Sequence, residues 1–231
     1  MNSISAHASE FSREFITTKN QVQILYSQAG FTFFFPAIAA VSLSWVLWGV
    51  AERYLLCTWL GLVMVHALAR YHLLWSYHHE NVTPDNAVIW LKRFLASVLS
   101  SGIIWGSAGI VLVPYTNSIE YTLFNGLTML ITCGLVSGAL ISYSINIWVL
   151  VAYSFPALVP PAVHLIALGD RYNSAFGGFI LLYYVFIGVA AVRMNRQFSC
   201  YVEMELQQKD LNYKYEKLKL VYADFRKRLR Q

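Results

Sequence analysis

Charged side chains are scarce in this 231-residue chain, and three long stretches contain none. Asp, Glu, Lys and Arg make up 13% of the residues, against about 25% in soluble domains, while 57% are hydrophobic. No charge occurs in residues 94–113, 121–143 or 175–192. Because about 20 apolar residues cross a bilayer core of about 30 Å, these stretches argue against a soluble domain and predict membrane-spanning helices.

Cysteine and catalytic signatures are also rare. The three cysteines, Cys57, Cys133 and Cys200, form no CxxC pair, which argues against a disulfide framework and a cysteine-based metal site. The chain contains no P-loop, GxSxG or HExxH pattern, and no histidine follows His164. We therefore assign no catalytic residue and no metal ligand. The first twenty residues lack a short apolar core with a cleavage site, so no signal peptide is predicted.

The remaining pattern predicts an all-α integral membrane protein, a six-transmembrane-helix bundle followed by a cytoplasmic parallel coiled-coil helix. Residues 1–29 form a cytoplasmic or interfacial segment, 30–192 the six-span membrane domain and 193–231 the coiled coil. The predicted spans are residues 30–50, 54–77, 91–113, 121–143, 145–168 and 175–192.

The distribution of basic residues predicts the orientation. Residues 193–231 hold ten Lys and Arg against five Asp and Glu, which accounts for the whole net charge of +5. Basic residues beside spans stay in the cytoplasm, so we expect both termini there, in a multi-pass membrane protein. A single basic tail is weak evidence for nucleic acid, and we expect membrane lipids but no nucleic acid as partners.

After residue 192 the apolar period changes to seven. Apolar residues recur every seven residues at two positions three apart, with one polar exception at Gln208, as along the seam of a parallel coiled coil. No proline interrupts residues 179–231, so we expect the sixth span to continue into this helix and the chain to form a homodimer. The alternative is an amphipathic helix that folds back on its own chain. The predicted dimer contacts are Tyr201, Met204, Leu211, Tyr215, Leu218, Tyr222 and Phe225.

The third to fifth predicted spans supply a candidate ligand cavity. Three prolines, Pro156, Pro160 and Pro161, are expected to break the fifth span, and broken helices need shelter in a bundle or a cavity. Aromatic rings nearby suit a lipophilic small-molecule ligand, although a solid bundle with proline kinks explains the same residues. The candidate ligand-binding residues are His66, Trp105, Tyr143, Trp148, Tyr153 and Pro156.

Other intramembrane features receive structural interpretations. Arg70 lies near the inner end of the second span, where we expect its side chain to reach the membrane surface. The pairs Gly102/Gly106 and Gly134/Gly138 are expected to let helices pack closely. A haem held by His66 and His164 is disfavoured because their depths differ by about 10 Å, so no cofactor is predicted.

One segment carries a resemblance. Residues 90–94, Trp-Leu-Lys-Arg-Phe, precede 102–106, Gly-Ile-Ile-Trp-Gly, and a glycine-rich fourth span follows. This arrangement resembles the MASE-type and related multi-span sensor domains of bacterial histidine kinases, diguanylate cyclases and class III nucleotide cyclases. The resemblance implies a homodimer, an inward-projecting signalling helix, and a kinase or cyclase output domain beyond Gln231 that would carry any enzymatic activity.

Three functions are open at this point. The first is a sensory input and dimerisation module of a signal-transduction receptor. The second is a small-molecule or ion transporter or channel that uses His66 and Arg70. Only the fifth span is expected to be broken by proline, and no internal repeat is evident, which counts against a transporter. The third is a membrane scaffold or effector whose coiled coil binds a partner.

Overall fold

A computed structural model of the chain describes residues 2–80, 83–114 and 118–228. Each of its elements is a helix, and no strand occurs in these ranges. Side chains are described for residues 20–28, 34–80, 83, 86–114, 119–198 and, in the last helix, 200, 204, 207, 208, 211, 212, 214, 215 and 217–219.

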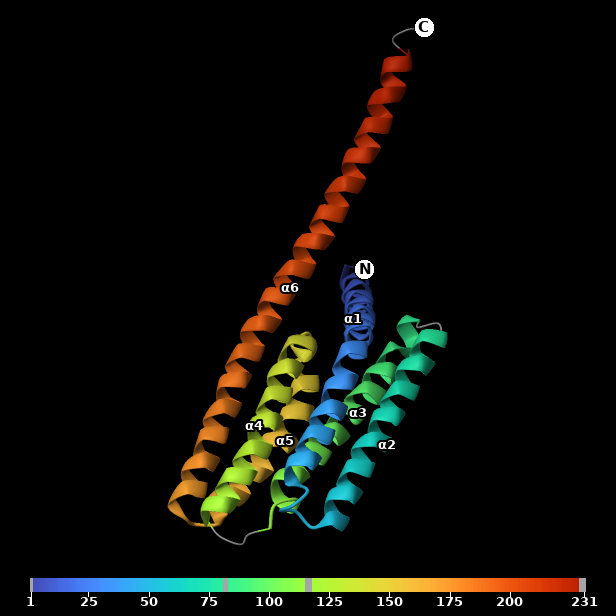
Figure 1. Cartoon of the computed structure of the whole chain (residues 1–231). Coiled ribbons are helices and arrows are strands. Elements are labelled where there is room, and N and C mark those ends of the chain that lie inside the picture. Colours follow the sequence, from blue (N-terminus) through green and yellow to red (C-terminus); the bar gives the residue numbers. More distant parts are fainter. Residues whose placement is uncertain (1, 81–82, 115–117, 229–231) are drawn as a thin grey trace.

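The helices run alternately up and down, and the last one projects far beyond the others (Figure 1). Both termini lie on the same side of the bundle, as the predicted topology requires. Among the described residues, five helices, α2 to α6, are long and apolar enough to cross a membrane, which indicates a membrane protein. The helices are α1 (Asn2–Leu47), α2 (Arg53–His79), α3 (Pro84–Val111), α4 (Ser118–Tyr143), α5 (Ile147–Ala167) and α6 (Arg171–Arg228).

The prediction differs from the structure at the first helix and agrees with it at the last. α1 is one helix from Asn2, and its described apolar part, Phe34–Leu47, is shorter than a full span. The predicted boundary at residue 29 therefore falls inside a helix. The predicted continuity at the other end is confirmed, because α6 runs without interruption over 58 residues from Arg171 to Arg228.

Helices α3 and α5 form the centre of the bundle. Half of the most apolar window of each is buried, against 22% for α2 and α6. Glycine allows the two to approach closely, because a Cβ atom at Gly102 or Gly106 would collide with the backbone carbonyl of Tyr153 or Pro156. The expectation of close packing is confirmed for this glycine pair.

The prolines of α5 do not break it. Pro156, Pro160 and Pro161 all lie inside one helix, so the predicted interruption of the fifth span is wrong. Residue 160 has no N–H, and the Pro156 carbonyl therefore lacks its usual intrahelical donor. Gly106 of α3 packs directly against this carbonyl, which places the altered part of α5 in the centre of the bundle, where neighbouring helices shelter it.

An aromatic cluster joins α1, α2 and α3 at the end of the bundle nearest the termini. The Tyr26 ring stacks on Tyr77 at 3.8 Å, and its hydroxyl donates to the carbonyl oxygen of Trp90 at 3.3 Å. Trp90 also lies under the Arg93 guanidinium, 4.7 Å from its ring centre. Trp90 and Phe94 are buried here, so both belong to the core of the bundle.

Candidate ligand-binding site

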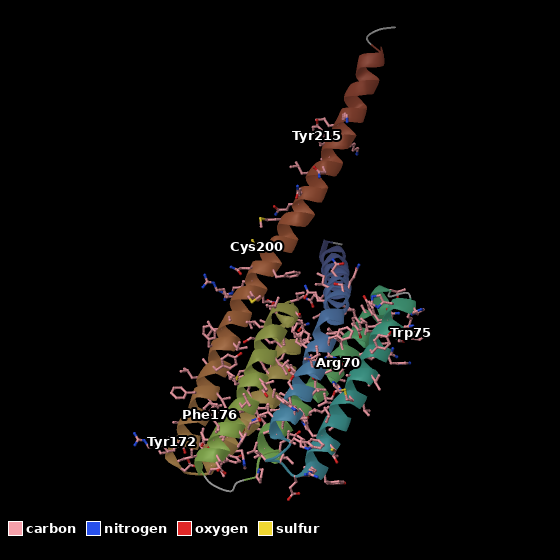
Figure 2. All side chains as sticks on the ribbon, in the orientation of Figure 1. Arg70, Trp75, Tyr172, Phe176, Cys200 and Tyr215 are labelled. Atoms are coloured by element: carbon pink, nitrogen blue, oxygen red, sulfur yellow. The ribbon has the colours of Figure 1, made fainter. Side chains whose placement is uncertain are left out.

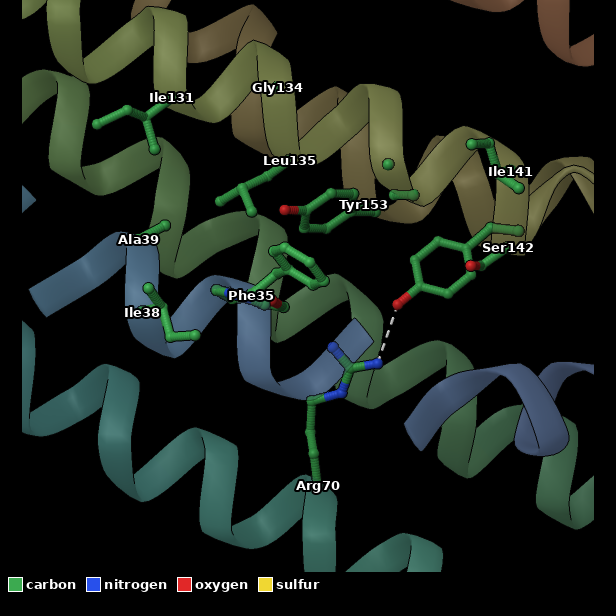
Figure 3. A pocket seen from close by; sticks show the side chains of 15 residues that line it. Phe35, Ile38, Ala39, Arg70, Ile131, Gly134, Leu135, Ile141, Ser142 and Tyr153 are labelled. Carbon is green, nitrogen blue, oxygen red and sulfur yellow. Dashed lines mark hydrogen bonds between the residues drawn. The ribbon is translucent and has the colours of Figure 1, made fainter. Parts of the chain in front are cut away.

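Arg70 is the charged residue buried deepest in the bundle. It lies in α2, about 13 Å before the end of that helix at about 1.5 Å per residue. Its side chain is only 6% exposed, and its Nη2 atom donates a hydrogen bond of 3.0 Å to the Tyr143 hydroxyl (Figure 3). The expectation that Arg70 extends to the membrane surface is therefore wrong, because the guanidinium points across the bundle to the last residue of α4.

Aromatic rings hold Tyr143 in place for this bond. Phe94 of α3 contacts the Tyr143 ring edge-on at 5.8 Å between centroids, and Tyr153 of α5 does so at 6.2 Å. All three rings are buried. Arg70 is therefore held by a hydroxyl whose own ring is packed from two sides, and the pair joins α2 to α4.

A pocket of about 600 Å³ opens beside this pair. Its long wall comes from α4, and its opposite wall comes from Phe35–Ala39 of α1. Arg70, Ser101 and Tyr153 close it from α2, α3 and α5. The volume lies within the range of about 300–1,000 Å³ that small-molecule sites occupy. The α4 residues along the wall include Ile131, Gly134, Leu135, Gly138, Ile141 and Ser142.

The pocket has a polar end and an apolar end. Figure 3 shows Arg70 and Ser142 toward one end, and Ile131, Ile38 and Ala39 toward the other. Along α4 the distance from Ile131 to the helix end is about 18 Å, at about 1.5 Å per residue. The site is thus an elongated apolar groove that ends at a positive charge.

Glycines make room for the groove. A Cβ atom at Gly134 or Gly138 would meet nothing within 4 Å, and both residues line the pocket. Within one protomer the predicted close packing of this pair is not found, since both glycines are exposed and no described atom lies within 4 Å of either Cβ position. Their missing side chains leave open the space between α4 and α1.

A second, much smaller pocket lies on the other side of Arg70. It has a volume of about 20 Å³ and is lined by His66 and Trp105, among others. Such a volume is enough for about one water molecule. The Nε2 atom of His66 is buried and has no hydrogen-bond partner among the described residues. His66 therefore lies beside the main site rather than in its wall.

The structure separates the six predicted ligand-binding residues. Tyr143 and Tyr153 line the main pocket, and His66 and Trp105 line the small one. Pro156 lines neither of these two pockets and packs against Gly102 of α3. Trp148 is 76% exposed on the outer surface of α5, away from both pockets.

Sequence reasoning missed the residues that shape the groove. Arg70 was noticed as a charge in a span, but its direction depends on Tyr143, which lies 73 positions later. Gly134 and Gly138 were noticed for their spacing, which does not reveal whether a neighbour covers them. The sequence signals that pointed toward them were an intramembrane charge and a pair of small residues four apart.

The described residues include no group of three or more His, Cys, Asp or Glu side chains placed to hold a metal ion. The three cysteines are free. No observation tests the interpretation of His66 and His164 as unsuited to haem, and it stays a prediction.

Comparison with family models, curated proteins and solved structures gives no match for this chain. Support for a function therefore comes from the geometry of the bundle and its last helix.

Proposed function

We propose that the chain is the membrane-embedded input and dimerisation module of a bacterial signal-transduction receptor. A stimulus in the α1–α4 pocket shifts α4, and α6 carries the shift to a cytoplasmic kinase or cyclase. The observation that carries this proposal is the unbroken course of α6 from the bundle into the projecting tail. At about 1.5 Å per residue, its 58 residues extend about 87 Å.

Hydrogen bonds between α4 and α6 supply the mechanical link. The Tyr183 hydroxyl of α6 donates to the Cys133 carbonyl at 2.7 Å and lies 2.6 Å from the Ser137 hydroxyl. Cys133 and Ser137 each directly precede a pocket glycine, Gly134 and Gly138. A ligand that displaces this turn of α4 would therefore also displace α6, through the hydrogen bonds of Tyr183.

A second link lies where α4 ends. The Asn195 side chain of α6 donates to the carbonyl oxygens of Ser144 and Ile145, at 2.8 and 2.9 Å. These residues directly follow Tyr143, the partner of Arg70. The polar end of the pocket is thus joined to α6 at the point where the tail leaves the bundle.

The tail presents an apolar stripe for a second copy. The side chains of Met204, Leu211, Tyr215 and Leu218 are exposed, and Figure 2 shows Tyr215 far from the bundle. Exposed apolar residues at coiled-coil spacing favour burial against an identical helix. The predicted contacts Tyr201, Tyr222 and Phe225 have side chains outside the described residues.

The same stripe continues into the bundle. Counting back by sevens from Tyr201 reaches Ile187 and Ile180, which are buried against the bundle. In a straight helix the stripe drifts by about 20° per heptad, so the face held by the bundle passes gradually into the face offered to a partner. Rotation of α6 against α4 and α5 would therefore turn the dimer contacts as well.

Charges at the two ends of the bundle support the proposed orientation. Lys92, Arg93, Arg193 and Arg196 lie toward the side of the termini, whereas the other ends of the helices carry Arg53 and Arg171 with Glu52, Glu120 and Asp170. Positive charge is retained in the cytoplasm, so the tail projects inward from the inner membrane. In this topology α1 supplies the first of six spans.

Cysteine crosslinking in membranes tests the proposal. With Cys57, Cys133 and Cys200 replaced by alanine, cysteine at Leu218 should crosslink to its symmetry mate under mild oxidation, several-fold faster than cysteine at Lys217. Both positions are exposed in a single protomer, so accessibility alone predicts equal rates. Equal rates, or no crosslinking at either position, would contradict a parallel seam.

A companion variant, with Leu211 and Leu218 both changed to Asp, should abolish the tail dimer. Paired carboxylates in a seam repel one another and lose apolar burial. The helical content and thermal stability of the membrane bundle should remain unchanged, because these side chains contact nothing in it.

A further inference from the structure

We propose that the α1–α4 pocket binds a single-chain lipid with a carboxylate head group, that is, a long-chain fatty acid from the inner leaflet. The inference rests on the proposed function, since it names the ligand class of the site in which that function places the stimulus. Charge, shape and access each support it.

The charge of the pocket selects an anion. Among the described residues that line the pocket, Arg70 is the one charged residue, and none is Asp or Glu. A guanidinium keeps its charge at every relevant pH and matches the two oxygens of a carboxylate in a bidentate pair. The hydroxyls of Tyr143 and Ser142 lie at the same end and supply further hydrogen-bonding groups.

The shape of the pocket selects one extended chain. Beyond Arg70 the lining becomes apolar, through Leu135 to Ile131 of α4 and Ile38 of α1. The groove follows α4 for about 18 Å, at about 1.5 Å per residue. Its volume of about 600 Å³ accommodates one acyl chain, and we expect the second chain of a phospholipid to stay outside.

The direction of the groove also fits a lipid. Its polar end lies at the end of α4 nearest the termini, and its apolar end lies deeper in the bundle. With the proposed topology, a fatty acid in the inner leaflet has the same direction, with its carboxylate toward the cytoplasm. The ligand therefore enters without turning over.

Access to the groove is from the bilayer. Phe35 and Ile38 of α1 and Ile141 of α4 line the pocket and are themselves exposed. These apolar residues belong to the lipid-facing surface, so the mouth between α1 and α4 opens sideways into hydrocarbon. A water-soluble anion would have to cross this apolar surface, whereas a fatty acid already resides there.

Photolabelling of the full chain tests the proposal. The protein is placed in nanodiscs of neutral phosphatidylcholine at alkaline pH, with a diazirine-bearing hexadecanoic acid as the probe. Label should appear on the α1 and α4 segments of the pocket. The matched hexadecanol probe should label these segments at least about tenfold less, because it has no carboxylate to pair with Arg70. Equal labelling by acid and alcohol would overturn the proposal.

The two possible lipid sources are separated by competition. Unlabelled hexadecanoic acid should displace the probe, whereas a two-chain phosphatidic acid at equal concentration should not. Equal displacement by phosphatidic acid would show a general anionic-lipid surface and overturn the single-chain assignment.

Three variants locate the probe and test the contact with its head group. Gly138→Leu places a side chain in the groove, where its Cβ atom meets nothing within 4 Å, and should reduce labelling about tenfold or more. Gly61→Leu makes the same change at an open position of α2 outside the pocket, and should leave labelling unchanged. Arg70→Gln should abolish the preference for the acid over the alcohol. Unchanged labelling in Gly138→Leu would place the probe elsewhere and overturn the proposal.

The labelling experiment tests the ligand and the crosslinking experiment at Leu218 tests the dimer, so one proposal can be contradicted without the other. Acid-selective labelling without Leu218 crosslinking supports the ligand and overturns the signalling dimer. Leu218 crosslinking without acid-selective labelling supports the dimer and overturns the ligand. If the chain is a receptor for this ligand, hexadecanoic acid should change the crosslinking rate at Leu218 when the pocket is native. It should not change that rate in the Gly138→Leu variant.

Discussion

Two glycine pairs with the same spacing lie on neighbouring helices and face opposite environments. Gly102 and Gly106 of α3 lie against the α5 backbone, with no room for a Cβ atom. Gly134 and Gly138 of α4 have nothing within 4 Å of a Cβ atom and line the pocket. The comparison teaches that the same spacing either brings two helices together or keeps a groove open, according to what covers that face.

The largest expected effect is at the covered pair. Gly106→Ala should destabilise the bundle by about 3 kcal/mol or more, because the added Cβ meets the Pro156 carbonyl, and a backbone carbonyl in the centre of the bundle cannot move aside. The loss of stability is measured as a fall in the melting temperature in detergent, monitored by the helical circular dichroism signal. A stable Gly106→Ala variant would show that α3 and α5 are not in close contact.

A smaller effect is expected at the polar end of the open face. Tyr143→Phe removes the hydroxyl that accepts from Arg70 and should cost about 1.5–3 kcal/mol, the value of a hydrogen bond to a charged group. The same melting experiment measures it, with Tyr172→Phe at an exposed site as the matched control. Equal stability of the two variants would mean that the bond to Tyr143 does not contribute to holding α2 against α4.

The smallest effect is expected at the uncovered pair. Gly138→Ala should be neutral or stabilise the bundle by up to about 1 kcal/mol, since alanine favours a helix and the added methyl group meets open space. Its melting temperature, set beside that of Gly106→Ala, gives the comparison directly. A large loss of stability would indicate that another element, such as a second copy of the chain, covers this face of α4.

Much of the helical layout was predictable from the sequence. The charge-free runs located α3, α4 and the membrane part of α6, because a bilayer core tolerates few charges. α4 ends at Tyr143, as predicted, and α6 continues into the tail. The prolines misled the prediction for α5, because a helix in the centre of a bundle has neighbouring helices to shelter what proline leaves unpaired.

The candidate site was predictable only in part. The aromatic content of the third to fifth spans pointed to Tyr143 and Tyr153, which line the pocket. Trp148 comes from the same stretch but is exposed, because a helix presents residues five apart on different faces. The contribution of α1 was missed, since nothing local to Phe35 indicates that it lies across from α4.

Local chemistry explains this division. Hydrophobicity and the spacing of apolar residues were enough to predict long apolar helices and a final helix whose apolar residues repeat every seven positions. These properties depend on each helix alone. Only the tertiary structure decided that Arg70 turns inward to Tyr143 and that Gly138 stays uncovered while Gly106 is covered. Burial of a side chain is set by whichever helix lies opposite, and that helix comes from a distant part of the sequence.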